Sequence, residues 1–170
     1  MRNSMVSSGI FALCLGLLYS PVIMAQSVTP PVAATSPMRA HALRLRPGDD
    51  LRDALLAYVA QQHLGAGAVL TCVGSLTVAT LRLANQEAPT EYHGHFEIVS
   101  LVGTLSATGG SHLHLSVSDS TGRTLGGHLL AGCRVYTTAE IVLVALPELE
   151  FTRETDPTFG YKELVVKPKK

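Results

Sequence analysis

The sequence predicts an α+β fold in which one or two helices pack on an antiparallel β-sheet. The segment from about Asp50 to Leu64 has apolar residues at helical spacing, whereas most of the chain after it forms apolar or alternating segments typical of strands. Short turns separate these strand-like segments. Because parallel neighbours need long crossover connections, the short turns favour antiparallel pairing.

The expected helix is bounded by residues that interrupt regular structure. Before it stands Pro47-Gly48-Asp49-Asp50, in which either aspartate can cap the first turn, and after it comes Gly65. One strand is expected ahead of the helix, over residues 40–46. The strands expected after it span residues 68–73, 77–84, 96–102, 112–118, 124–130 and 139–146.

The first 25 residues have the layout of a secretory signal peptide. Arg2 supplies a positive charge, residues 10–18 form an apolar centre, and Ala25 is a small residue at the expected cleavage point before Gln26. The apolar centre is shorter than the roughly 20 residues of a permanent span, so no permanent membrane span is expected. A retained membrane anchor is the alternative. We therefore expect a periplasmic or secreted protein.

The rest of the chain has room for one domain. Residues 26–37 are rich in Ser, Thr, Pro and Ala without charge, which is typical of a flexible linker. The domain is expected over residues 38–166, followed by a basic tail over 167–170. Basic and acidic residues number 13 each, and Lys and Arg are not clustered as phosphate binding requires. Nucleic acid is therefore not an expected partner.

Removal of the signal peptide would leave two cysteines, Cys72 and Cys133. An exported protein can form disulfides. Both cysteines, however, lie in apolar strand-like segments, and buried free thiols are common in such places. The sequence favours free thiols but leaves pairing open, because it does not give the distance between the two Cα atoms.

Three histidines form the best candidate site. His112 and His114 lie two residues apart on an expected strand, so both imidazoles point to one face. A loop at 119–122 folds the next strand back beside them. If Ser118 opposes Arg123, His128 lies on the wrong face, and we expect a β-bulge at the paired glycines 126 and 127 to bring it opposite His114.

Three neutral imidazoles suit zinc and leave a fourth position for water or substrate. Copper, nickel and iron are chemically possible with the same ligands. The alternative is that these are ordinary histidines on a solvated sheet face. An enzyme would also need a nearby base, and Glu97, on the preceding strand, is the candidate for that role or for orienting an imidazole.

Other polar residues are less informative. His93 and His95 flank Gly94 at strand spacing, and a surface role is favoured for both. Arg82, between two leucines, faces either a cleft or solvent. The chain contains no phosphate-binding loop, dinucleotide fingerprint or Ser-His-Asp order.

Several segments together resemble the PPC (plants-and-prokaryotes-conserved) domain family. They are Gly74-Ser-Leu76, Gly94-His-Phe-Glu-Ile-Val-Ser-Leu-Val-Gly-Thr-Leu-Ser106, His112-Leu-His-Leu-Ser-Val-Ser-Asp119, Gly126-Gly-His-Leu-Leu-Ala-Gly-Cys133 and Val135-Tyr-Thr-Thr-Ala-Glu-Ile-Val-Leu143. They occur in order, with few gaps, between about Met38 and Val166.

The resemblance implies an α+β domain that assembles as a homotrimer and binds a metal at the three histidines. Plant members add an AT-hook, a short basic motif that enters the DNA minor groove, and this chain has none. We therefore expect an exported, trimeric, zinc-binding domain whose physiological ligand is unknown, with a small molecule at the metal as the candidate. The alternatives are a zinc-dependent enzyme acting on a small molecule and, by family analogy alone, a DNA-binding protein.

Overall fold

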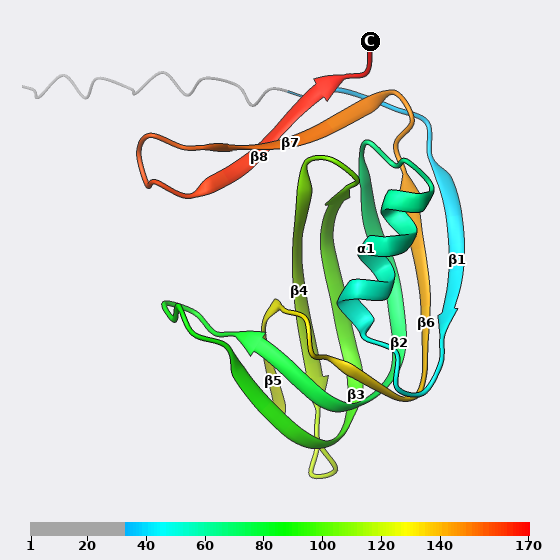
Figure 1. Cartoon of the computed structure of the whole chain (residues 1–170), viewed down its shortest axis with the longest axis vertical. Helices are drawn as coiled ribbons and strands as arrows, with labels where there is room; N and C mark the ends of the chain where they lie inside the picture. Colours follow the sequence, from blue (N-terminus) through cyan, green and yellow to red (C-terminus); the bar gives the residue numbers. More distant parts are fainter. Residues whose placement is uncertain (1–32) are drawn as a thin grey trace, which may run out of the picture. The chain divides into compact units, whose positions relative to one another are not determined.

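The structure, a computed structural model, describes residues 33–170. One helix and eight strands follow each other along this part of the chain (Figure 1). They are β1 (Arg39–Leu45), α1 (Leu51–Gln61), β2 (Gly67–Arg82), β3 (Thr90–Ser106), β4 (Gly110–Ser118), β5 (Thr124–Leu129), β6 (Arg134–Ala145), β7 (Leu149–Thr155) and β8 (Lys162–Pro168). The expected signal peptide and most of the expected linker lie outside the described residues.

Six strands form one sheet in the order β1-β6-β2-β3-β4-β5, and every pairing in it is antiparallel. A short second pairing joins β5 to β2, through Leu81 with Leu129 and Arg82 with His128. The sheet is therefore curled at this end, with β5 held between β4 and β2. The α+β class and the antiparallel arrangement predicted from the sequence are confirmed.

Two of the strands are longer than the sequence pattern suggests. β2 continues through Gly74, where the sequence predicted a turn, and β3 starts at Thr90 and runs through Gly103. A Cβ on Gly74 would lie 2.0 Å from the carbonyl oxygen of Thr138, and the residue has φ +142°. The glycine thus allows a close approach of β6, and the strand bends there instead of ending.

The helix begins as predicted and ends three residues early. The Asp50 carboxylate accepts hydrogen bonds from the backbone N–H groups of Arg52 at 3.1 Å and Asp53 at 3.0 Å, which caps the first turn. The same carboxylate accepts a bond from Gly132 N at 2.6 Å, which ties the helix to the β5–β6 turn. At the other end His63 adopts a positive φ, so the chain leaves the helix before Gly65.

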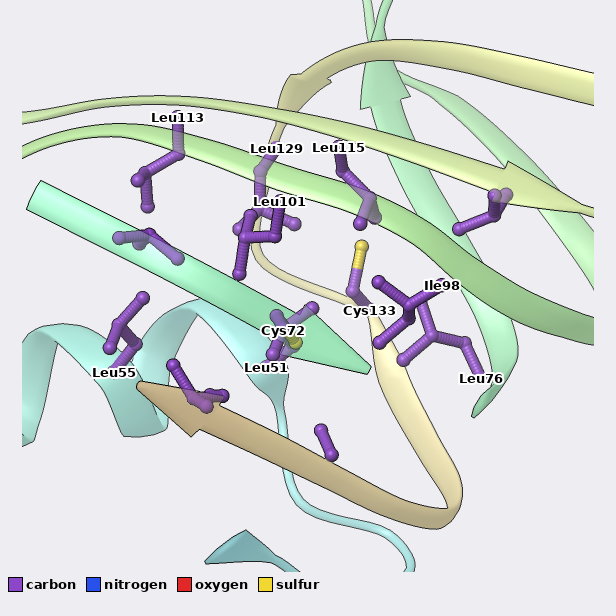
Figure 2. Packing of buried hydrophobic residues seen from close by; sticks show 14 of the residues in the cluster. Leu51, Leu55, Cys72, Leu76, Ile98, Leu101, Leu113, Leu115, Leu129 and Cys133 are labelled. Atoms are coloured by element: carbon purple, nitrogen blue, oxygen red, sulfur yellow. The ribbon is translucent and has the colours of Figure 1, made fainter. Parts of the chain in front are cut away.

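The core lies between the helix and the face of the sheet that the helix covers (Figure 2). Leu51, Leu55 and Val59 recur along one side of α1 and are fully buried. They pack on inward-pointing side chains of the central strands, including Leu76, Leu101, Leu115, Ile141 and Leu143. The same alternation turns the residues between these leucines toward the opposite face, where the histidines of β4 are found.

Both cysteines of the described chain are free and buried in this core. Burial raises the pKa of Cys72 to about 12 and that of Cys133 to about 11. The Cys133 thiol also accepts a hydrogen bond from Thr80 N at 3.2 Å. Both groups therefore stay protonated at neutral pH and serve as small apolar core residues.

Strands β7 and β8 form a separate hairpin that the sequence pattern did not indicate. Leu149 and Phe151 of β7 pack with Ala66, and Phe151 N donates a 2.9 Å hydrogen bond to Gly65 O. In Figure 1 the hairpin crosses the end of the sheet at which β4 begins. β8 extends to Pro168, and Lys167 pairs with Glu154 at 2.8 Å, so the strand includes two residues of the expected basic tail.

Within residues 33–170, no helix is long and apolar enough to cross a membrane.

Candidate metal centre

Three histidines meet on the face of the sheet that points away from the helix. On β4, Leu113 and Leu115 are buried while His112 and His114 alternate with them and point outward. His128 on β5 is the direct cross-strand partner of His114. Directly opposed residues share a face, so the structure places all three imidazoles together, as the sequence analysis expected.

The register that achieves this differs from the expected one. Ser118 pairs with Thr124 rather than Arg123, and the pairing continues without a shift to His114 and His128. The connecting loop is one residue longer than assumed and is closed by a hydrogen bond from Asp119 N to Arg123 O at 3.0 Å. The expected β-bulge at the paired glycines is therefore wrong, because the loop supplies the extra residue.

The two glycines have another role. A Cβ on Gly126 would lie 2.9 Å from Leu115 O on β4, and one on Gly127 would lie 2.7 Å from Arg82 O on β2. Side chains there would force the neighbouring strands away. The glycines thus let β5 fit closely between β4 and β2, and this holds His128 beside the other two histidines.

The three rings are close enough to share one ion. Nε2 of His112 lies 3.2 Å from Nε2 of His114, and one ring nitrogen from each of the three residues falls within 4.8 Å of the others. The rings of His112 and His128 are nearly parallel, with centroids 5.1 Å apart, and His114 stands edge-on to both. Nitrogens bound to tetrahedral zinc at 2.0–2.1 Å are separated by about 3.3 Å, so small ring rotations suffice.

Electrostatics favour the neutral imidazole, which is the form that binds metal. Partial burial and then the Arg153 guanidinium lower the pKa of His112. Partial burial and then the Arg82 guanidinium lower the pKa of His128. At neutral pH both rings therefore have a free nitrogen lone pair, and protons compete with a metal only at more acidic pH.

The structure does not bring Glu97 to this cluster. Glu97 is exposed and pairs with Ser118, four residues along β4 from His114, which corresponds to about 13 Å along a strand. Its expected roles as a base or as a partner of an imidazole are therefore not supported by its position. His93 and His95 are exposed, and His95 stacks on Tyr136 with ring centroids 4.3 Å apart.

Two charged residues that the sequence analysis did not single out do reach the site. Arg153 of β7 and Glu163 of β8 lie beside His112 and His114, and together they line a hollow of about 250 Å³. Their side chains approach each other to 3.9 Å. The other residues lining the hollow are Val102, Gly103, Thr104 and Leu164. The sequence carried no signal for this, because the hairpin itself was not predicted.

Comparison with known proteins agrees with the architecture described above. The model of the Plants and Prokaryotes Conserved domain matches residues 32–147. This chain belongs to that family. The resemblance noted from the sequence is thereby confirmed, and the matched region includes all three histidines.

The relatives of this Plants and Prokaryotes Conserved domain include proteins of quite different length. A hypothetical protein from Salmonella enterica has a solved structure with a TM-score of 0.78 and 47% identity, covering 80% of this chain and 98% of that one. The bifunctional protein GlmU of a Synechococcus strain is 50% identical over 131 residues, which is 77% of this chain. The chain spans about a fifth (21%) of the length of that relative.

A more distant solved structure belongs to a protein described as metal-containing. The metal-containing protein of Archaeoglobus fulgidus has a TM-score of 0.67 and 22% identity, covering 78% of this chain and 99% of that one. At this identity the likeness shows the fold alone.

Proposed function

We propose that this domain binds one divalent metal ion, zinc in the first place, through His112, His114 and His128. The observation that carries the proposal is that one ring nitrogen from each of the three histidines lies within 4.8 Å of the other two on one face of the sheet. It is supported by the metal-containing protein of Archaeoglobus fulgidus, which has the same fold. Zinc is favoured because imidazole nitrogens and a flexible tetrahedral geometry suit it.

Three protein ligands leave the fourth tetrahedral position open, which distinguishes this group from a closed structural site. The role that fits best is binding of a ligand at the metal. A hydrolytic enzyme would need a base free to take a proton from metal-bound water. Glu97 is distant, and Glu163 lies near the Arg153 guanidinium, so neither carboxylate favours turnover.

Metal analysis of protein purified without a histidine tag tests the proposal. We expect one zinc per chain after exposure to zinc and removal of excess ion at pH 7.5. Because the pKa values of His112 and His128 are lowered below the ordinary histidine value of about 6.5, zinc should still be retained at pH 6.5 and released only at more acidic pH, as protons occupy the nitrogens. A chain that holds no stoichiometric zinc at pH 7.5 would contradict the proposal.

A homotrimer is also proposed. It is supported by exposed apolar side chains on three central strands: Leu70 and Val73 on β2, Val99 on β3, and Tyr136 on β6. Exposed apolar surface of this kind is often covered by association. Light scattering at micromolar concentration should give three times the chain mass, and a monomer would rule the trimer out.

Export to the periplasm or medium is proposed on the pattern of residues 1–25 alone, with Gln26 as the first residue of the mature chain. N-terminal sequencing of protein recovered from cell fractions would decide it, since an intact Met1 on cytoplasmic protein excludes export.

A further inference from the structure

The three histidines are flanked by positive charge on two sides. Arg82 is the cross-strand partner of His128 on β2, and Arg153 lies beside His112 and His114 on β7. Both guanidinium groups act on His112, whose pKa each of them lowers. Arginine has no neutral form at physiological pH, so these charges are permanent features of the surroundings.

A bound divalent ion would add to this charge. Three neutral imidazoles leave both charges of the ion uncompensated, and Arg82 and Arg153 contribute one more each. Among the charged residues that line the hollow or act on His112, Glu163 is the only carboxylate. The open coordination position therefore faces a net positive environment, which favours an anion over water or a neutral molecule.

The side chain of Arg153 is fixed in position beside the histidines. Its side chain is only 17% exposed, it donates a hydrogen bond to the carbonyl oxygen of Lys162, and the Glu163 carboxylate lies 3.9 Å away. These partners fix the guanidinium in place, so little conformational entropy is lost when it binds a ligand. The guanidinium geometry also matches the two oxygens of a carboxylate.

The hollow next to the metal position is small and partly apolar. Its volume is about 250 Å³, near the lower limit of about 300 Å³ for small-molecule pockets. Val102 of β3, 51% exposed, and Leu164 of β8, 38% exposed, both line it. A short hydrocarbon chain would cover both of these apolar side chains.

We propose that the open position on the metal takes the carboxylate of a small organic acid, that Arg153 binds this carboxylate, and that Val102 and Leu164 contact its carbon chain. The inference rests on the proposed metal site and specifies its ligand class. Metal binding itself is assigned to the histidines, and Arg153 is assigned only to the anion, so the two ideas can be tested separately.

Calorimetric titration of zinc-loaded protein with pentanoate tests the proposal, with pentanamide and inorganic phosphate as comparison ligands. Pentanamide has the same shape without the charge, and phosphate has the charge without the carbon chain. We expect pentanoate to bind at least about tenfold more tightly than pentanamide, which lacks the charge-assisted pair with Arg153, and at least about tenfold more tightly than phosphate, which has no carbon chain to contact Val102 and Leu164.

Arg153→Gln should weaken pentanoate binding by about tenfold while the variant keeps one zinc per chain. Lys167→Gln is the matched control, because it also removes one cation from the same hairpin and breaks one ion pair with a glutamate. It should bind pentanoate as the parent does.

The outcomes separate the two ideas. If the parent binds zinc but prefers pentanamide or phosphate, or if Arg153→Gln binds pentanoate like the parent, the organic-acid proposal is overturned and the metal site stands. If the parent binds no zinc, both are overturned.

Discussion

His114→Ala should lower zinc affinity by about a hundredfold or more, because loss of an outer partner of a ligand alone costs 10–100-fold. His114 Nε2 lies 3.2 Å from that of His112, and its ring is edge-on to those of both other histidines. Its removal leaves two ligands, which cannot complete a tetrahedral zinc site. Calorimetric zinc titration at pH 7.5 would measure the change, and His112→Ala and His128→Ala should behave in the same way.

The control for these variants is His93→Ala. His93 is an exposed histidine on β3, and its ring contacts Glu91 rather than another histidine. The variant should bind zinc with the affinity and stoichiometry of the parent, which excludes diffuse binding by surface histidines. If His112→Ala, His114→Ala and His128→Ala all bound zinc as the parent does, the zinc would be held at another place in the protein.

Gly103→Ala should destabilise the domain strongly. Gly103 lies near the C-terminal end of β3 opposite Leu113, with φ +139°, and an added Cβ would lie 1.9 Å from His112 O. The contact is with backbone, so β3 and β4 must separate to relieve it. Backbone strain and overpacking each cost about 1–3 kcal/mol, so we expect a loss of about 4 kcal/mol in the free energy of unfolding, measured by urea denaturation.

Gly110→Ala separates the cost of backbone strain from the cost of the steric contact made by the added Cβ. Gly110 also has a positive φ, +82°, but nothing lies within 4 Å of an added Cβ. Only backbone strain remains, and the expected loss is about 1 kcal/mol. If both variants lost the same free energy of unfolding, the close approach of β4 at Gly103 would not contribute to the effect of Gly103→Ala.

Local patterns in the sequence were enough to predict the helix, the antiparallel sheet and the shared face of His112 and His114. Helical spacing with a capping aspartate identifies α1, and alternation with period two identifies β4 and its two faces. His128 was correctly predicted to lie opposite His114, but the predicted register of β4 and β5, with a β-bulge, was wrong. The length of the loop after Ser118 decides that register, and residue types within the loop do not determine its length uniquely.

Local sequence patterns could not predict that Arg153 and Glu163 lie beside the histidines. Arg153 and Glu163 come from a hairpin that follows the histidine strands β4 and β5 and also β6 along the chain, and its short strands contain charged residues on both faces. Its position depends on the packing of Leu149 and Phe151 against Ala66, a contact between distant segments. Glu97 was proposed because it is on the strand that precedes the histidines, whereas the β3–β4 pairing sets it opposite Ser118, the last residue of β4.

The region matched by the family model ends at residue 147, and the β7–β8 hairpin begins at Leu149. The three histidines therefore lie inside the matched region, and Arg153 lies outside it. If the proposed ion and its carboxylate ligand are bound as inferred, substitutions at hairpin positions that face the hollow should alter the choice of ligand and leave the three histidines in place. Two proteins with identical histidines but different C-terminal hairpins would then be expected to bind different ligands at the metal.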